Sequence, residues 1–260
     1  MVSSSEDFEK VKGQSPIVEG LGKGAWKFIS IIHSQTGHSY HRLFRDWLDL
    51  MLLTFLSQTA KGAGNLKQHE AYEQKYLSIV DNYKDNRNQG KRNIDLFAKA
   101  MAELVNEMTE TEQDVLGALY MEHITSGEGG QFFTPEPITE MMVKMINPTQ
   151  QNASISDPAC GSGRMLLAAH KVNPSAHLFG TDVDEQCAKM CALNCFLFGC
   201  RATVVWGNTL TMEAWACWDI GFVYMFERDP AAMMVQQKET PLQVITPQKL
   251  KTDKQLGFDW

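Results

Sequence analysis

The chain has 260 residues, 43% of them hydrophobic and 21% charged, a composition that excludes a wholly disordered or fibrous protein. A net charge of −7 excludes a basic, nucleic-acid-binding surface over the whole chain, although a local basic patch stays possible. Six cysteines are too few for a disulfide scaffold, no secretory signal is visible, and charged residues interrupt the most apolar stretch. We therefore expect a soluble, cytoplasmic protein with reduced thiols and no membrane contact.

Three parts are predicted along the chain. Residues 1–24 are polar and rich in serine and glycine, and they indicate a flexible N-terminal arm. Residues 25–123 carry apolar side chains at helical spacing, as at Leu43 and Trp47, and they predict a helical domain. A glycine-rich spacer then breaks the helical pattern, so residues 124–260 are predicted to form a second domain.

The helical domain has a predicted capped helix and a stretch of dense positive charge. A helix is predicted over residues 111–123, and Thr109 or Thr111 is expected to cap it. The stretch at residues 83–92 holds the densest positive charge, from Lys84, Arg87, Lys91 and Arg92. A solvated loop is the favoured interpretation of this stretch, and a phosphate-contacting patch is the alternative.

The second domain alternates short β-like runs with helical patterns. Strands are predicted at residues 153–156, 177–181, 202–206 and 219–226, and helices at residues 164–172 and 185–198. Strands that alternate with helices favour parallel βαβ units in a doubly wound sheet.

A glycine loop follows the first predicted strand. Residues 156–166 read Ser-Asp-Pro-Ala-Cys-Gly-Ser-Gly-Arg-Met-Leu, in which Gly161 and Gly163 permit positive φ and close approach of a ligand. The free N–H groups at the start of the next helix favour an anionic group such as a carboxylate. Leu166 stands where a dinucleotide fingerprint has its third glycine, which disfavours an NAD site.

Two further polar residues follow the second and third strands. Asp182 lies 19 residues after Gly163, where a carboxylate can accept both hydroxyls of a ribose; a helix cap is the alternative. Asn208 lies in the segment Trp-Gly-Asn-Thr-Leu and could face an adenine ring; a turn is the alternative.

Together these segments resemble a known family. Residues 157–163 resemble the S-adenosylmethionine loop of amino-group DNA methyltransferases, above all the modification subunits of type I restriction systems and short methylase-like proteins of phages and mobile elements. Residues 130–135, Gly-Gln-Phe-Phe-Thr-Pro, resemble the family's upstream cofactor motif, and residues 114–120 also fit. The resemblance spans about residues 110–210. It implies an α/β, Rossmann-like class I methyltransferase fold, S-adenosyl-L-methionine as cofactor, and adenine N6 of DNA as methyl acceptor.

The resemblance also implies a role for each matching residue. The loop would hold the amino-acid end of the cofactor, the Phe-Thr-Pro segment would close over it, and Asp182 would bind the ribose. Asn208 would lie beside the adenine; the family often has Asp there, and Asn keeps an acceptor. The predicted cofactor-binding residues are Phe133, Thr134, Pro135, Asp157, Pro158, Ala159, Cys160, Gly161, Gly163, Asp182 and Asn208.

The family's catalytic motif does not occur in the 260-residue sequence. An Asn/Asp-Pro-Pro-aromatic tetrapeptide normally grips a target adenine flipped out of the duplex, and none occurs in the chain. The nearest remnant is Asp229-Pro230, beside which Tyr224 or Phe226 could stack the base. Since 34 residues follow Phe226, we expect a truncated sheet with at most one more strand, at residues 244–246, and no target-recognition domain.

The cysteines suggest a second kind of site. Cys187, Cys191 and Cys195 recur at i, i+4 and i+8, but ligands on one straight helix cannot surround an ion. Packing against the sheet is favoured over a metal or iron–sulfur site. Cys160 lacks a neighbouring base at recognisable spacing, so close packing is also favoured over a nucleophile.

Three functions remain open. The first is a DNA adenine-N6 methyltransferase or modification-subunit-like protein of a restriction-modification or mobile-element system. The second is a catalytically defective, S-adenosylmethionine-binding regulatory or anti-restriction module, which gains weight from the missing tetrapeptide. A small-molecule or RNA methyltransferase explains the Phe-Phe-Thr-Pro segment less well. The expected partners are DNA, bound weakly by the chain alone, and a specificity subunit, a methyltransferase subunit or a second copy.

Overall fold

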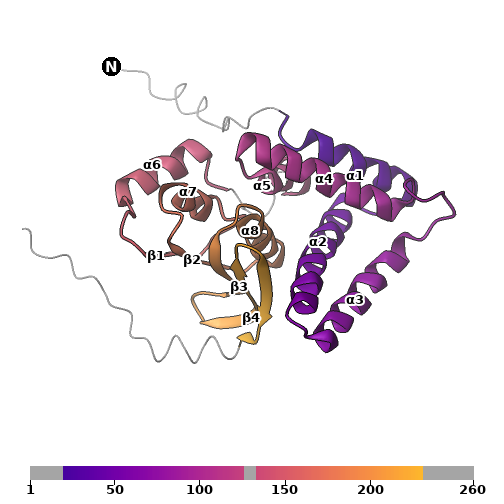
Figure 1. Cartoon of the computed structure of the whole chain (residues 1–260). Coiled ribbons are helices and arrows are strands. Elements are labelled where there is room, and N and C mark those ends of the chain that lie inside the picture. The colour runs from indigo at the N-terminus through magenta and orange to yellow at the C-terminus, as the bar shows by residue number, and fades with distance from the viewer. Residues whose placement is uncertain (1–19, 126–132, 231–260) are drawn as a thin grey trace, which may run out of the picture.

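The computed structural model describes residues 20–125 and 133–230 of the chain (Figure 1). Most of the predicted arm, the first three residues of the Gly-Gln-Phe-Phe-Thr-Pro motif and the predicted strand at residues 244–246 lie outside the described residues.

The N-terminal part is helical, as predicted. Leu21 is buried and the first helix begins at Lys23, so the last residues of the predicted arm belong to the helical part. A short 3₁₀ turn, η2 (Asp81–Tyr83), and a π-turn, η3 (Met121–Thr125), accompany the helices. The helices are α1 (Lys23–Thr36), α2 (Tyr40–Gly62), α3 (Leu66–Val80), α4 (Asn93–Thr111) and α5 (Val115–Tyr120).

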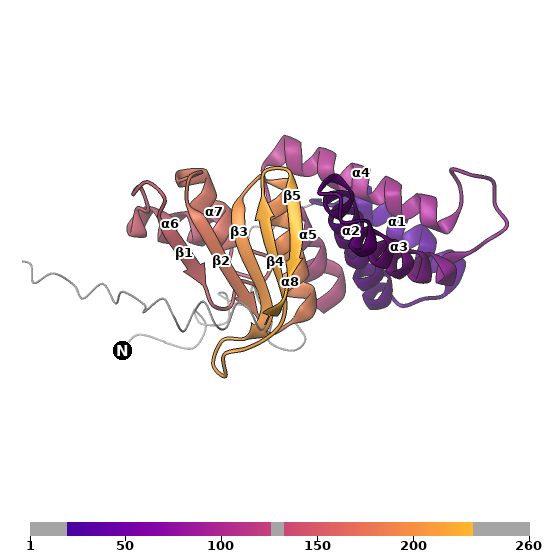
Figure 2. The ribbon, with the colours of Figure 1, turned by 60° about the horizontal axis from the view of Figure 1, so that its bottom comes forward.

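The C-terminal part is a five-stranded sheet with helices on one face. The strand order is β1-β2-β3-β4-β5, and β1, β2 and β3 are parallel. Figure 2 shows helices α6, α7 and α8 behind the strands. The predicted helices and the first three strands are confirmed to within two residues. The elements are α6 (Glu136–Ile146), β1 (Ser154–Asp157), α7 (Arg164–Val172), β2 (His177–Asp182), α8 (Glu185–Leu197), β3 (Arg201–Asn208), β4 (Glu213–Gly221) and β5 (Tyr224–Arg228).

The predicted fourth strand over residues 219–226 is wrong. It is an antiparallel hairpin: β4 runs antiparallel to β3, and β5 runs antiparallel to β4. Ile220 and Met225 pair across the hairpin and are both buried, so the apolar pattern fits two short strands as well as one long one. At the turn, a Cβ on Gly221 would collide with the ring of Tyr224. The sheet is therefore mixed rather than all parallel, and within the described residues β1 pairs only with β2.

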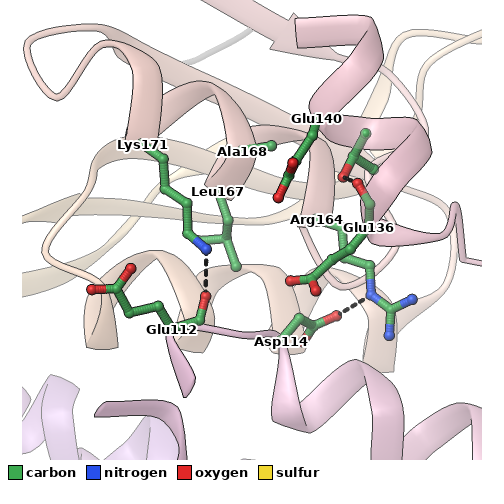
Figure 3. Close-up of a pocket in the computed structure, with 9 residues that line it drawn as sticks. Glu112, Asp114, Glu136, Glu140, Arg164, Leu167, Ala168 and Lys171 are labelled. Carbon is green, nitrogen blue, oxygen red and sulfur yellow. Dashed lines mark hydrogen bonds and ion pairs between the residues drawn. The ribbon is translucent and has the colours of Figure 1, made fainter. Parts of the chain in front are cut away.

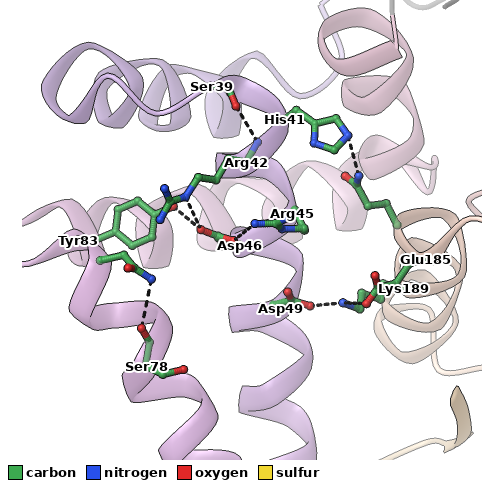
Figure 4. A network of polar contacts seen from close by, with 12 residues as sticks. Ser39, His41, Arg42, Arg45, Asp46, Asp49, Ser78, Tyr83, Glu185 and Lys189 are labelled. Atoms are coloured by element: carbon green, nitrogen blue, oxygen red, sulfur yellow. Dashed lines mark hydrogen bonds and ion pairs between the residues drawn. The ribbon is translucent and has the colours of Figure 1, made fainter. Parts of the chain in front are cut away.

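The helical part packs directly against α8 and the hairpin. The Nζ of Lys189 on α8 lies 2.5 Å from Asp49 on α2 (Figure 4). The side chain of Gln186, also on α8, lies 3.0 Å from the ring of His41 on α2. The ring centroids of Phe55 on α2 and Phe196 on α8 lie 4.5 Å apart. One hydrophobic core runs from Leu21 to Met225 through both parts. The division at residue 124 into two domains stays a prediction.

Candidate cofactor-binding site

Three predicted site residues meet at one edge of the sheet. Because β1, β2 and β3 are parallel, their carboxyl ends lie together, and those ends carry Asp157, Asp182 and Asn208. Hydrogen bonds join the loops that follow these strands: the backbone N–H of Cys160 donates to Thr181 O at 3.0 Å. The hydroxyl of Thr209 donates to Pro158 O at 2.8 Å. Hydrogen bonds therefore link the glycine loop to the end of β2 and to the segment that follows β3.

The glycine loop has the conformation that its glycines permit. Gly161 and Gly163 have φ of 53° and 93°. A Cβ on Gly161 would lie 2.9 Å from the Phe133 ring, and one on Gly163 would lie 2.9 Å from the Cys191 sulfur. Helix α7 starts directly after the loop, and no side chain caps its N-terminus. Its first-turn N–H groups can therefore receive an anionic group such as a carboxylate.

Asp182 links the loop to the second strand. One of its oxygens accepts the backbone N–H of Gly161 at 2.8 Å, and the other accepts that of Asp184 at 2.9 Å. A carboxylate has about four acceptor positions, so both oxygens can still receive ribose hydroxyls. Burial raises the pKa of Asp182, and burial also raises the pKa of Asp157. The donor and acceptor set thus fits the ribose and amino-acid parts of S-adenosylmethionine.

Asn208 makes the turn that was the alternative interpretation. Its side-chain oxygen accepts the backbone N–H groups of Leu210 at 2.9 Å and Thr211 at 3.3 Å. The turn occupies this oxygen, which leaves the amide nitrogen as the group suited to contact a ring. Nearby, the Trp206 indole donates to Val183 O at 3.2 Å, and the Val183 side chain is exposed.

Phe133 lies against the glycine loop. Its ring stacks on that of Tyr120, with centroids 5.7 Å apart and an angle of 13° between the rings. The guanidinium of Arg164 lies 5.6 Å from the centroid of the same ring. Thr134 and Pro135 follow, and Pro135 is the residue before α6. The structure thus brings Phe133 to the loop.

Sequence reasoning missed Asp114 as a helix cap. The predicted caps Thr109 and Thr111 are wrong, because both hydroxyls donate to carbonyls of the preceding turn within α4, each at 2.7 Å. Asp114 caps α5 instead, accepting the backbone N–H of Gly117 at 2.8 Å. The same carboxylate accepts Arg164 Nε at 2.8 Å (Figure 3). An Asp-x-x-Gly spacing before an apolar run was the signal that could have revealed it.

The candidate catalytic pair does not join this site. Asp229 and Pro230 follow β5, and three strands separate β5 from β1. At a spacing of ~4.8 Å per strand, the end of β5 lies roughly 19 Å along the sheet from the end of β1. Tyr224 and Phe226 lie on the same far strand. The arrangement therefore does not support Asp229 as an acceptor beside the cofactor loop.

The structure supports packing as the role of the cysteines and a solvated loop as the interpretation of the basic stretch. All six cysteines are buried and none forms a disulfide, and burial raises the pKa of Cys187, which makes that thiol unreactive. In the basic stretch, acids neutralise three of the four cations. Lys84 pairs with Asp81 at 2.8 Å, Arg87 with Asp85 at 3.7 Å and Arg92 with Asp95 at 2.8 Å.

The parallel strands, the glycine loop after β1 and the acid after β2 define a Rossmann-like, class I S-adenosylmethionine-dependent methyltransferase fold, here with an antiparallel hairpin beyond β3. The family model described as N-6 DNA Methylase matches residues 111–230. Over these residues, just under half of its length, the chain is similar to the N-6 DNA methylase family.

Individual relatives are similar over limited parts. The chain is 28% identical over 123 residues to the type I restriction enzyme MjaVIII methylase subunit of Methanocaldococcus jannaschii, covering 44% of this chain and 20% of that protein. It is 37% identical over 78 residues to the type II methyltransferase M.XamI of Xanthomonas campestris pv. amaranthicola, covering 29% of this chain and 15% of that protein. The chain thus spans about a fifth or less of these relatives' lengths.

One solved structure with a similar fold is that of the methyltransferase subunit of a type I restriction-modification system from Streptococcus thermophilus. It superposes with a TM-score of 0.38 at 15% identity, over 70% of this chain and 56% of that one. Among the described residues, none of the helices is both long and apolar enough to span a membrane.

Proposed function

We propose that this chain is the S-adenosylmethionine-binding part of a DNA adenine-N6 methyltransferase, of the modification-subunit kind found in restriction-modification systems or mobile elements. One observation carries the proposal. The glycine loop, Asp182 and Asn208 lie side by side at the carboxyl edge of three parallel strands, within the stretch that matches the N-6 DNA methylase family. The description of the matching family, N-6 DNA Methylase, and the name of the type I restriction enzyme methylase subunit support DNA as substrate.

Each part of the edge has a separate task in this proposal. The N–H groups at the start of α7 receive the amino-acid carboxylate, and Asp182 accepts the ribose hydroxyls. Asn208 and Val183 flank the adenine ring, and Phe133 covers the loop. When bound, S-adenosylmethionine supplies an activated methyl group, while these residues hold and orient the cofactor.

The residues that grip the target adenine are proposed to come from outside this part. No Asn/Asp-Pro-Pro-aromatic tetrapeptide occurs in the 260 residues, and Asp229 is remote from the loop. DNA, and a specificity or methyltransferase subunit or a second copy, are the partners that this proposal calls for. The alternative, a regulatory or anti-restriction module, has no counterpart among the two relatives named above, which are a methylase subunit and a methyltransferase.

Calorimetry with S-adenosylhomocysteine tests the proposal. We expect the full chain to bind, and Asp182→Ala to weaken binding by about 1.5–3 kcal/mol, the scale of hydrogen bonds to a charged group. Asp219→Ala is the matched control, because Asp219 belongs to the same sheet but contacts Thr203 and Arg228 on β3 and β5. Undiminished binding by Asp182→Ala would refute the ribose assignment, and no binding by the unaltered chain would refute the proposal.

A further inference from the structure

Asp114 is a buried carboxylate that no predicted cofactor contact uses. It is 3% exposed and lies at the start of α5, outside the glycine loop in sequence. Burying a charge is costly unless it is paired and hydrogen-bonded, so its partners indicate what it holds in place.

Four donors converge on this carboxylate. One oxygen accepts hydrogen bonds from the hydroxyl of Ser162, in the glycine loop, and from Nε of Arg164, the first residue of α7. The other oxygen accepts the backbone N–H of Gly117 at 2.8 Å and the Asn194 side-chain amide at 2.7 Å. One side of the carboxylate therefore holds the loop, and the other side holds α5 and α8.

Ser162 is held from two directions. Its hydroxyl donates to Asp114, and its backbone carbonyl accepts the Asn194 amide at 2.8 Å. Ser162 lies between Gly161 and Gly163, and it is 1% exposed. These contacts fix the one non-glycine residue at the tip of a loop whose flanking glycines would otherwise be conformationally free.

The close approach depends on Gly117. A Cβ at this position would collide with both the Asp114 carboxylate and the Ser162 hydroxyl. Only glycine lets α5 come this close to the loop, which explains the Asp-x-x-Gly spacing as a packing requirement.

The contact extends to the aromatic cover of the loop. Arg164 donates to Asp114 at 2.8 Å, and its guanidinium also lies over the Phe133 ring, 5.6 Å from the centroid. Phe133 lies against Gly161. A change at Asp114 therefore affects both the loop and the ring that lies on it.

We propose that Asp114 is the positioning residue of the cofactor loop: its carboxylate holds Ser162 and Arg164, so that the loop is shaped for the cofactor before the cofactor arrives. This inference rests on the proposed function for its consequence, cofactor affinity. The preformed loop geometry stands independently of that function.

The test uses the full chain with three variants. Asp114→Asn keeps the size but replaces one acceptor oxygen by an NH₂ group, which faces two donors whichever way the amide turns. Ser162→Ala removes one contact only. Asp46→Asn is the matched control: Asp46 is 7% exposed and accepts the Tyr83 hydroxyl at 2.7 Å within the helical part.

Two measurements are made on each variant. Hydrogen exchange of peptides covering residues 157–167, without ligand, reports the order of the loop, and calorimetry with S-adenosylhomocysteine reports affinity. We expect Asp114→Asn to accelerate loop exchange and weaken affinity at least tenfold, and Ser162→Ala to do the same less strongly. We expect Asp46→Asn to leave both unchanged. The double variant should lose less than the product of the two single losses, because both changes disrupt one contact.

The outcomes separate the two proposals. Wild-type loop exchange in Asp114→Asn, or equal acceleration by Asp46→Asn, would overturn the positioning role. If the unaltered chain binds no cofactor, the proposed function fails while the exchange data still decide the role of Asp114. If Asp114→Asn does not fold, Ser162→Ala decides: unchanged loop exchange and affinity in that variant overturn the proposal.

Discussion

The backbone N–H of Gly161 donates a hydrogen bond to the carboxylate of Asp182 at 2.8 Å. This contact joins the loop after β1 to the end of β2, so the residue predicted to bind the amino-acid end of the cofactor and the residue predicted to bind the ribose are in direct contact. A change in the charge of Asp182 therefore acts on both parts of the proposed site.

Cofactor affinity should depend on pH through Asp182. The ionised carboxylate is the form that accepts hydroxyls and the Gly161 N–H, and burial raises its pKa above the usual 3.8. Affinity is then full well above the raised pKa and falls as the pH decreases through it, beginning at a higher pH than an exposed aspartate would give. Calorimetry between about pH 8 and pH 5 measures this fall. Asp182→Asn should bind weakly at neutral pH with a flat profile; an unchanged slope in that variant would assign the titration elsewhere.

Gly161→Ala should damage the site more than its backbone angle alone predicts. Gly161 has φ of 53°, and an added Cβ would lie 2.9 Å from the Phe133 ring. Gly64→Ala is the control, because Gly64 has φ of 74° with open space around it. Both variants carry backbone strain of about 1–2 kcal/mol. Only Gly161→Ala should also weaken S-adenosylhomocysteine binding, and equal affinities in the two variants would argue against loop contact with the cofactor.

The sequence predicted the part of the fold that short local signals specify. Helix α7 begins and ends at the predicted residues, because Gly163 is its N-cap and Asn173, which follows the apolar run, is its C-cap. The hairpin was missed because β4 and β5 share one apolar alternation, and only pairing across Ile220 and Met225 distinguishes two strands from one. Pairing partners are long-range information that a single sequence does not carry.

The site was predicted to a similar extent. The glycine loop and Asp182 carry spacing signals, and the structure brings them together. Asp114 could not be assigned its contacts, since three of its four donors lie 48 to 80 residues away in the sequence. The basic stretch was visible as positive charge, but the ion pair of Arg92 with Asp95 depends on how helix α4 begins.

Lys189 should stabilise the contact between the helical part and the sheet. Its ammonium lies 2.5 Å from Asp49 and 2.6 Å from Glu185, and the residue is 7% exposed. Lys189→Met leaves the partly buried Asp49 without its cation, and losing a hydrogen bond to a charged group of this kind costs about 1.5–3 kcal/mol. Lys144→Met is the control, because Lys144 and its partner Glu140 are exposed and 3.7 Å apart; its cost should stay below about 0.5 kcal/mol. Urea unfolding of both variants compares them, and equal costs would show that the Lys189 contacts contribute little.

The isolated chain should bind duplex DNA weakly. Asp81, Asp85 and Asp95 pair with three of the four cations in the basic stretch. We expect non-specific binding with a dissociation constant of about 10⁻⁴ M at physiological salt. The affinity should fall steeply as the salt concentration rises. Fluorescence anisotropy at two salt concentrations measures it. Neutralising Lys84, Arg87, Lys91 and Arg92 together should abolish the residual binding, and tight, salt-insensitive binding would contradict this interpretation.

Methyl transfer by these 260 residues alone should be slow or absent. The proposed cofactor side of the site lies at the ends of β1, β2 and β3, but the sequence has no Asn/Asp-Pro-Pro-aromatic tetrapeptide that would supply an acceptor and a stacking ring for the target adenine. Without them the adenine amino group is not held in line with the methyl group, and such positioning is worth ~7–11 kcal/mol of barrier. Labelled cofactor and unmethylated DNA, with and without candidate partner subunits, provide the assay. Asp229→Ala should change nothing, because Asp229 follows β5, and three strands lie between β5 and β1. Transfer at an ordinary enzymatic rate that vanishes in Asp229→Ala would instead make the Asp-Pro remnant the working site.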